Sequence, residues 1–275
     1  MERIFSRAIR AKKKEGKIAV IADIKPYSPK EGDLFQGRGA AEIALKLKAA
    51  GAPCLSVVTE QQHFRSSLSL LRSVAAETGL PVLCKDFITT EQALAETKEA
   101  GAAAVLLICA MQTEASLARL LNAARRLELE ALVETHNAAE FTLAMKLGAQ
   151  LIGINNRDIL QLERDGGGVG TTEALLRQVP QIQTAAVRAS ACGQPKGRTL
   201  QAGNPPLFIS ESGIQTAADV RRAVCAGADA VLIGTALLKA ADIAACYRSL
   251  SQPPAETPPR HGGGPGRRST GQTGR

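Results

Sequence analysis

The chain has 275 residues, a net charge of +8 at pH 7, no Trp and two Tyr. Its longest apolar runs, such as Ala102–Ile108, are too short to cross a bilayer, so we expect no membrane-spanning segment. The basic excess lies in residues 1–17, 181–206 and 251–275, which we interpret as solvated ends and one insertion. This location, together with the scarcity of aromatic side chains for base stacking, argues against nucleic acid as a partner.

Cysteine usage points to a reducing compartment. Six cysteines are present, and no two have the C-x-x-C spacing of a metal or redox site. Cys54, Cys84 and Cys109 lie in or beside apolar runs, where reduced thiols act as small hydrophobic side chains. Residues 1–17 contain no apolar segment of signal-peptide length. We therefore expect a cytoplasmic protein without a metal site.

Short apolar runs alternate with helical segments along the body of the chain. Eight runs are almost continuous in Val, Ile, Leu and Ala, which is typical of parallel strands covered on both faces. These predicted strands are Ile18–Ile24, Cys54–Thr59, Pro81–Lys85, Ala104–Ile108, Ala131–Glu134, Leu151–Asn155, Leu207–Glu211 and Ala230–Gly234. Apolar residues at helical spacing predict helices between them. The clearest are Ala40–Ala50, Glu91–Ala100, Glu114–Leu127, Ala138–Leu147 and Ala217–Ala226.

Capping residues support the helices. Four of them follow a residue suited to an N-cap, namely Thr90, Thr113, Asn137 and Thr216. Glycines suited to helix ends stand at Gly51, Gly101, Gly148 and Gly227. Eight strands alternating with helices over this length predict an α/β fold, a single (β/α)8 TIM barrel. A doubly wound sheet is the alternative, but no G-x-G-x-x-G motif follows the first strand.

Two segments and the N-terminus fall outside this alternation. Residues 18–250 are predicted to form the barrel after a short basic N-terminal segment, residues 1–17. Residues 180–206 are rich in Gly, Pro, Gln and Ala, which predicts a flexible insertion before the seventh strand. Residues 251–275 are rich in Pro and Gly with almost no large apolar residue, which predicts a disordered basic tail.

Polar side chains follow seven of the eight predicted strands at the point where each strand ends. In a barrel of this kind the carboxyl ends of the strands meet on one rim, where active sites form. Each residue alone could be a solvated loop residue, but their coincidence predicts a site. The residues are Asp23 with Lys25 and Ser28, Thr59 with Glu60, Lys85 with Asp86, Glu134, Asn155 with Arg157, Glu211 with Ser212 and Gly213, and Gly234 with Thr235.

The last two strands predict a phosphate site. Gly213 and Gly234 allow the backbone to approach an anion closely, while Ser212 and Thr235 offer hydroxyl groups. The alternative is that the Gly-Thr pair only caps a helix. The fold context favours phosphate, because barrels of this type often bind it after strands seven and eight.

A lysine and two carboxylates end apolar strands on the same rim. Lys85, Glu134 and Glu211 together could supply an acid, a base and charge stabilisation to a reaction. A structural ion-pair network inside the barrel mouth is the alternative, and these residues alone do not decide between the two. His63 and His136 are interpreted as loop or capping residues.

Several blocks resemble the indole-3-glycerol-phosphate synthase family, over about Ile18 to Ala240. The most specific are Lys85-Asp86-Phe87, Asn155-Asn156-Arg157-Asp158 and Glu211-Ser212-Gly213-Ile214, in this order. Further matches are Ile21-Ala22-Asp23-Ile24-Lys25 with Ser28-Pro29, Ser56-Val57-Val58-Thr59-Glu60 with Phe64, Leu132-Val133-Glu134 and Val231-Leu232-Ile233-Gly234-Thr235. The resemblance implies a cofactor-free carboxy-lyase of tryptophan biosynthesis. Its substrate, 1-(2-carboxyphenylamino)-1-deoxyribulose 5-phosphate, would close a ring with loss of CO2 and water.

The resemblance also implies roles for single residues. Lys85 would protonate the ketone oxygen, and Glu134 would act as the acid/base carboxylate of the dehydration. Asn155 would position the reacting centre, and Glu211 would support the developing cation. The other implied contacts are Lys25 with the substrate carboxylate; Ser28, Arg157 and Ser212 with polar groups; Phe64, Phe87 and Ile159 with the anthranilate ring; and Gly213, Gly234 and Thr235 with the phosphate.

The chain departs from the family pattern near the ring end of the substrate. Asp23 stands where the family usually has Glu, which shortens a catalytic carboxylate by one methylene, and Pro26 replaces a usual basic residue. The short N-terminal segment leaves room for at most a vestige of the family's extra helix over the barrel mouth. Two alternatives therefore stay open: a divergent paralogue acting on another phosphorylated aromatic amine, or a non-catalytic barrel that binds a phosphometabolite or a protein. We expect a monomer or weak dimer, and a contact with another tryptophan-pathway enzyme is open.

Overall fold

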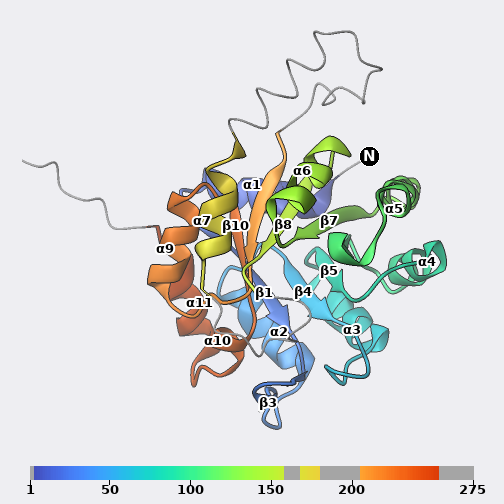
Figure 1. Ribbon diagram of the computed structural model, residues 1–275. Helices are drawn as coiled ribbons and strands as arrows, with labels where there is room; N and C mark the ends of the chain where they lie inside the picture. The colour runs from blue at the N-terminus through green and yellow to red at the C-terminus, as the bar shows by residue number, and fades with distance from the viewer. Residues whose placement is uncertain (1–2, 158–167, 180–204, 254–275) are drawn as a thin grey trace, which may run out of the picture.

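The eight predicted strands form a closed parallel barrel. In the computed structural model, which describes residues 3–157, 168–179 and 205–253, their order is β1-β10-β9-β8-β7-β6-β5-β4 (Figure 1). Their bounds are β1 Ala19–Ile24, β4 Leu55–Val58, β5 Val82–Lys85, β6 Ala104–Ile108, β7 Glu130–Thr135, β8 Leu151–Asn155, β9 Leu207–Glu211 and β10 Ala230–Ile233. The predicted (β/α)8 fold is therefore confirmed. A short antiparallel hairpin, β2 Tyr27–Ser28 with β3 Gly32–Asp33, was not predicted.

Helices surround the barrel (Figure 1). Those named from the sequence are present, each one residue shorter at its C-terminal end: α2 Ala40–Ala49, α4 Glu91–Glu99, α5 Glu114–Arg126, α6 Ala138–Lys146 and α9 Ala217–Cys225. The side chains of Thr90, Thr113, Asn137 and Thr216 accept backbone N–H bonds as N-caps, as predicted. The remaining described helices are α1 Ile4–Lys14, α3 Leu68–Thr78, the 3-10 turn η1 Cys109–Met111, α7 Gly170–Leu176, α10 Thr235–Leu238 and α11 Ile243–Ser251.

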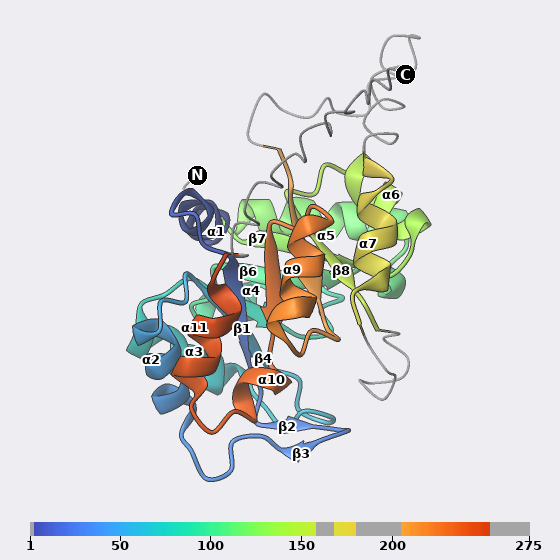
Figure 2. The same cartoon turned by 90° about the vertical axis from the view of Figure 1, so that its left-hand side faces the viewer.

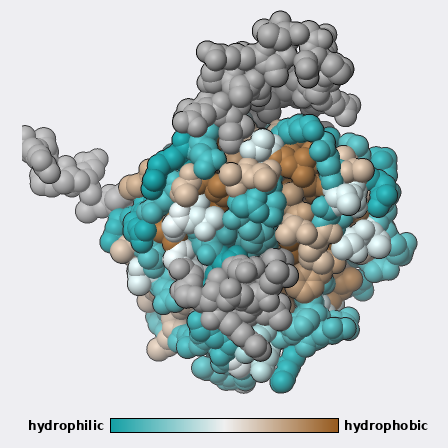
Figure 3. Space-filling model, in the orientation of Figure 1, coloured by the Kyte–Doolittle hydropathy of each residue, from teal (hydrophilic) through white to brown (hydrophobic). Residues whose placement is uncertain are grey.

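The apolar core has two layers, as the two-sided burial of the strands requires. One layer lies between the strands and the surrounding helices and includes Val20, Leu47 and Val105. The other fills the inside of the barrel with side chains such as Ile21 and Leu132. The described face shown in Figure 3 is mostly hydrophilic with smaller apolar patches. None of the helices in the described residues combines the length and apolar character needed to span a membrane.

Helix α1 closes the end of the barrel opposite the site. Figure 2 shows α1 at one end of β1 and the β2–β3 hairpin with α10 at the other. Phe5 and Ile9 are fully buried among residues at the starts of the strands. The carboxylate of Glu130, the first residue of β7, accepts hydrogen bonds from the backbone N–H groups of Phe5 at 2.7 Å and Ser6 at 3.1 Å. It thereby satisfies two of the donors that a helix N-terminus leaves open. The basic N-terminal segment is thus docked on the barrel through its apolar side.

Replacing Phe5 with alanine tests this docking. We expect Phe5→Ala to lower the free energy of unfolding by about 3–5 kcal/mol, because it empties a fully buried site. Ile4→Ala is the matched control: its side chain is 38% exposed, so the change should stay within about 0.5 kcal/mol. Urea unfolding of both variants measures the difference. Equal stability of the two would show that α1 contributes nothing to the fold.

Candidate active site

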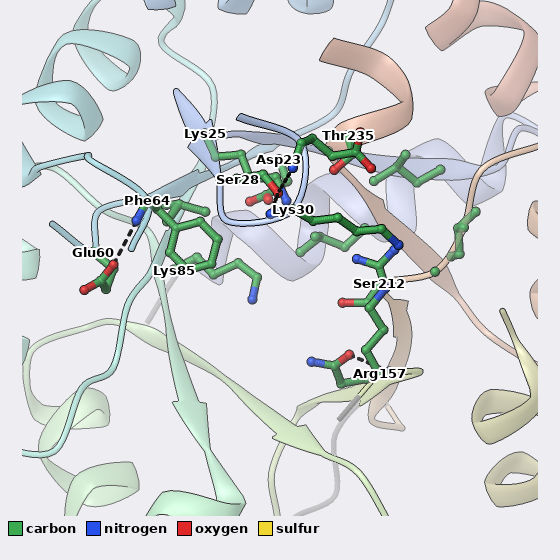
Figure 4. A pocket seen from close by; sticks show the side chains of 18 of the residues that line it. Asp23, Lys25, Ser28, Lys30, Glu60, Phe64, Lys85, Arg157, Ser212 and Thr235 are labelled. Atoms are coloured by element: carbon green, nitrogen blue, oxygen red, sulfur yellow. Dashed lines mark hydrogen bonds between the residues drawn. The ribbon is translucent and has the colours of Figure 1, made fainter. Parts of the chain in front are cut away.

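A cavity of about 400 Å³ opens at the carboxyl ends of the strands. In Figure 4 the amino group of Lys85 points toward its open centre, with Lys25 and Phe64 on one side and Arg157 and Ser212 on the other. Every site residue predicted from the sequence lines this cavity except Thr59, Glu211 and Ile159. Thr59 is buried, and its hydroxyl donates to Oδ2 of Asp86. Glu211 is fully buried close to the cavity, and Ile159 lies outside the described residues.

Lys85 and Glu134 face each other from the ends of β5 and β7. Nζ of Lys85 lies 3.5 Å from Oε2 of Glu134, whose side chain is 1% exposed. Burial opposes ionisation of this carboxyl group, but the charges of Lys85 and His136 outweigh burial and lower the pKa of Glu134 to about 2. The resting site therefore holds an ionised carboxylate beside a cationic amine, the pairing that an acid–base reaction needs.

Glu211 is a buried carboxyl group of a different kind. Within the described residues no hydrogen-bond donor lies within reach of either of its oxygens. Burial, followed by the negative charge of Glu134, raises the pKa of Glu211 to about 8. Its carboxyl group lies over Gly153 of β8, where a Cβ atom would come within 1.9 Å of Oε1. The site thus combines an ionised carboxylate with one that keeps its proton at neutral pH.

Glu211→Gln tests the protonation of this group. The folded protein keeps the proton to about pH 8, whereas an unfolded glutamate loses it near pH 4.5. Folding therefore favours the protonated form between these values, so stability falls as pH rises through this range. The glutamine variant has no such pH dependence. Between pH 4.5 and 8, its free energy of unfolding should therefore rise relative to that of the wild type by at least about 1.4 kcal/mol, the value of one pKa unit. A stability difference that does not change with pH would contradict the assignment.

Asp23 is held at the end of β1 by its neighbours. The hydroxyl of Ser56 on β4 donates a hydrogen bond of 2.6 Å to Oδ1 of Asp23. On the other side, a Cβ atom at residue 234 would lie 3.1 Å from Oδ2 and 3.0 Å from the backbone oxygen of Asp23. The absence of a side chain at Gly234 thus lets this carboxylate pack against β10.

The loops after β1 and β4 bring a cation and an aromatic ring together. Lys25 is 3% exposed, and its Nζ lies 5.9 Å from the centre of the Phe64 ring, within the range of a cation–π contact. The carboxylate of Glu60 accepts hydrogen bonds from the backbone N–H groups of Gln62, His63 and Phe64, which fixes the turn that presents the ring. These bonds lower the pKa of Glu60 although burial opposes them.

Two asparagine side chains at the end of β8 organise this part of the rim, and the second of them joins β8 to the end of β9. Oδ1 of Asn155 accepts the backbone N–H of Arg157 at 3.0 Å. The amide of Asn156 donates to the hydroxyl of Ser210 and to the backbone oxygens of Glu211 and Ser212 at 2.9–3.2 Å. Asn156 belongs to a motif quoted from the sequence, but its role in joining two strand ends could not be inferred there.

The predicted phosphate residues share one side of the cavity. Ser212 and Gly213 follow β9 with positive φ values of 64° and 70°. Such a conformation costs a side-chain-bearing residue about 1–2 kcal/mol, so Ser212 is a strained position beside the cavity. Gly234 and Thr235 follow β10 and line the same cavity. The backbone is therefore open to a ligand after both strands.

Four charged residues in or near the cavity were not predicted as site residues: Lys30, Glu31, Lys239 and His136. Lys30, from the β2–β3 turn, and Lys239, after α10, line the cavity, and Lys239 forms an ion pair of 2.6 Å with Glu31. His136 was interpreted as a loop or capping residue. It does follow β7, but its Nε2 lies 3.3 Å from Oε1 of Glu134. Its position directly after the end of β7, two residues beyond Glu134, was the signal available in the sequence.

The sequence of the chain matches known proteins of one family. A family model described as indole-3-glycerol phosphate synthase matches residues 1–204 and 196–250. The chain belongs to the indole-3-glycerol phosphate synthase family. An indole-3-glycerol phosphate synthase of Pyrococcus furiosus is 42% identical over 236 residues, which cover 86% of this chain and 91% of that protein. A Listeria monocytogenes protein of the same name is 39% identical over 84% of this chain and 81% of its own.

A solved structure agrees with the barrel fold of the synthase family. A crystal structure of 3-hexulose-6-phosphate synthase superposes with a TM-score of 0.57 over 85% of this chain and 98% of that protein. Its sequence identity is 16%, so it supports the fold and not the chemistry. Among the residues that the structure describes, no three His, Cys, Asp or Glu side chains are grouped as a metal ion would require.

Proposed function

We propose that this cavity converts 1-(2-carboxyphenylamino)-1-deoxyribulose 5-phosphate into indole-3-glycerol phosphate, CO2 and water, as a step of tryptophan biosynthesis. The observation that carries the proposal is the 3.5 Å contact of Lys85 with Glu134 inside the cavity that the phosphate-site residues also line. Family membership supports it, because the family model spans residues 1–250.

The ring end of the substrate meets Lys25, Phe64 and Phe87. The ammonium group of Lys25 binds the substrate carboxylate until it leaves as CO2, and the two phenylalanine rings flank the anthranilate ring. Lys25 is nearly buried against Phe64, which supports a single site for both parts of the substrate. Desolvation strengthens the attraction between an ammonium and a carboxylate.

Ring closure requires an acid at the ketone oxygen. Lys85 donates its proton there while the aromatic carbon attacks the carbonyl carbon, and the carboxylate then departs as CO2. General acid catalysis of this kind is worth about 10²–10⁴-fold in rate. The ionised Glu134 beside Lys85 keeps the amine cationic until the substrate takes the proton.

Dehydration completes the indole ring. The ionised carboxylate of Glu134 accepts the proton that the adjacent methylene loses and delivers it to the new hydroxyl, which leaves as water. Asn155 positions the reacting centre, while Asp23 and Glu211 stabilise the positive charge that develops on the ring nitrogen. Because its pKa of about 8 keeps Glu211 protonated at neutral pH, it acts through the dipole of its neutral carboxyl group.

The opposite end of the cavity binds the phosphate. The backbone around Gly213 and Gly234 approaches the oxygens, the Thr235 hydroxyl donates to them, and Ser28, Arg157 and Ser212 make further polar contacts with the substrate. The positive φ values of residues 212 and 213 support an exposed backbone in this loop. We also propose a cytoplasmic location. Oligomeric state and contacts with other tryptophan-pathway enzymes stay predictions.

Turnover of this substrate tests the proposal. Purified protein mixed with it should produce indole fluorescence and one CO2 per molecule consumed. The same compound without its phosphate is the control and should turn over far less efficiently. Binding of the substrate without any product would contradict the proposed function and favour a non-catalytic barrel. A chain that turns over only another phosphorylated aromatic amine would identify a divergent paralogue.

A further inference from the structure

A row of buried hydrogen bonds ends at the cavity beside Lys85. The hydroxyl of Thr97 on α4 donates to Sγ of Cys84 on β5 at 3.7 Å. This sulfur lies 3.3 Å from Oγ1 of Thr59, the residue directly after β4. The hydroxyl of Thr59 in turn donates to Oδ2 of Asp86 at 2.6 Å. Asp86 lines the cavity and follows Lys85 in the sequence, so the row connects a helix outside the barrel with the rim of the site.

The donors of this row point toward Asp86. Thr97, Cys84 and Thr59 are each at most 2% exposed. The single hydroxyl hydrogen of Thr59 is given to the carboxylate, so the thiol of Cys84 donates in the contact with Thr59. Burial raises the pKa of this thiol, which therefore keeps its hydrogen at neutral pH. Aligned hydrogen bonds in a low-dielectric interior strengthen one another, so the row holds the carboxylate in one place.

Thr59 and Asp86 also fix the backbone around Lys85. The backbone N–H of Thr59 donates to the backbone oxygen of Lys85 at 3.0 Å. Oδ1 of Asp86 accepts the backbone N–H of Phe87 at 2.8 Å, while its other carboxylate oxygen is held by Thr59. The peptide groups before and after Asp86 are therefore both anchored. The residues on either side of Asp86 are the proposed general acid and one of the two rings proposed to flank the substrate.

The row is polar where its surroundings are apolar. Cys84 belongs to the apolar layer between the strands and the helices, together with Val57 and Leu94. A buried hydroxyl costs stability unless it is hydrogen-bonded, whereas a valine of similar shape in the place of Thr59 would need no partner. What the hydroxyl adds at this place is a fixed direction for the carboxylate of Asp86.

We propose that Thr59 is a positioning residue for Lys85 and acts through Asp86. This role rests on the proposed function, in which Lys85 is the general acid. The amino group of Lys85 points toward the open centre of the cavity (Figure 4), and the peptide groups next to Lys85 decide where its flexible side chain reaches. A displacement of about 1 Å at a reacting group lowers the rate about 100-fold. Thr59 does not line the cavity and needs no contact with the substrate for this effect.

Thr59→Val and Thr59→Ser test the role as a pair. The valine variant keeps the size of the side chain and loses the hydroxyl, so its kcat should fall about 10–100-fold as Lys85 shifts. Its KM should change much less, because the contacts with the ring, the carboxylate and the phosphate come from other residues. The serine variant keeps the hydroxyl and loses only a buried methyl group, so its kcat should stay close to that of the wild type. Steady-state kinetics with the fluorescent product measures both constants.

Thr78→Val is the matched control. Thr78 is also a buried threonine, at the end of α3, and its hydroxyl donates to the backbone oxygen of Val74 at 2.7 Å. It does not line the cavity, so this variant should unfold at a lower urea concentration without losing kcat. Asp86→Ala is a second variant and should lower kcat at least as much as Thr59→Val does. Thr59→Val added to Asp86→Ala should lower kcat no further, because the hydroxyl acts through the carboxylate.

The role of Thr59 fails in any of four cases. A Thr59→Val variant that loses less than about tenfold in kcat, while the wild type is active, would remove the role alone. Equal losses of kcat in Thr59→Ser and Thr59→Val would indicate packing of the side chain and not its hydroxyl. A further loss of kcat when Thr59→Val is added to Asp86→Ala would show that Thr59 does not act through Asp86. A wild-type chain that forms no indole product would remove the proposed function and this role with it.

Discussion

Lys85→Ala is expected to lower kcat by about 10²–10⁴-fold, because it removes the acid that meets the ketone oxygen. KM should change much less, since the carboxylate, ring and phosphate contacts come from other residues. The variant should also raise the pKa of Glu134, because the charge of Lys85 is the largest influence that lowers it. Steady-state kinetics with the fluorescent product measures the first effect.

Lys146→Ala is the control for this variant. Lys146 is 64% exposed and pairs with Glu114 on the outside of the barrel, so its loss should leave kcat unchanged within error. A Lys85→Ala variant that keeps more than about a tenth of the wild-type kcat would exclude Lys85 as the general acid.

Gly153→Ala should reduce both stability and activity. Its Cβ atom would lie 1.9 Å from Oε1 of Glu211 and 3.5 Å from Cα of Glu134, so the buried carboxyl group has to move. Overpacking of this kind costs about 1–3 kcal/mol. A displacement of about 1 Å at a catalytic group lowers the rate about 100-fold. Thermal unfolding and kcat together measure the effect.

Gly170→Ala provides the comparison. A Cβ atom there meets nothing within 4 Å, so stability should change by less than about 0.5 kcal/mol. Normal stability and kcat in Gly153→Ala would mean that the position of Glu211 over β8 does not matter to the reaction.

The barrel and its rim could be predicted because they depend on local patterns. A run such as Val82–Lys85 is apolar until its last residue, and parallel strands place such ends on one side. The N-caps at Thr90 and Thr216 likewise depend only on neighbouring residues. The predicted cavity-lining residues from Asp23 to Thr235 therefore met in one place.

What could not be predicted depends on contacts between distant residues. No residue near Phe5 in the sequence indicates that the backbone at the start of α1 donates a hydrogen bond to Glu130, 125 residues away. The raised pKa of Glu211 follows first from its burial and then from the negative charge of Glu134, and this position depends on the strand register. The contacts of His136 with two carboxylates depend on the orientation of its ring, which a histidine after a strand does not reveal.

A crystal structure with a reduced substrate analogue that cannot cyclise tests the central claim most directly. The account predicts the aromatic ring between Phe64 and Phe87 and the phosphate against the backbone of Gly213 and Gly234. It also predicts Nζ of Lys85 within about 3.2 Å of the hydroxyl that replaces the ketone, the reach of a general acid. An analogue bound with its phosphate elsewhere, or with that hydroxyl out of reach of Lys85, would contradict it.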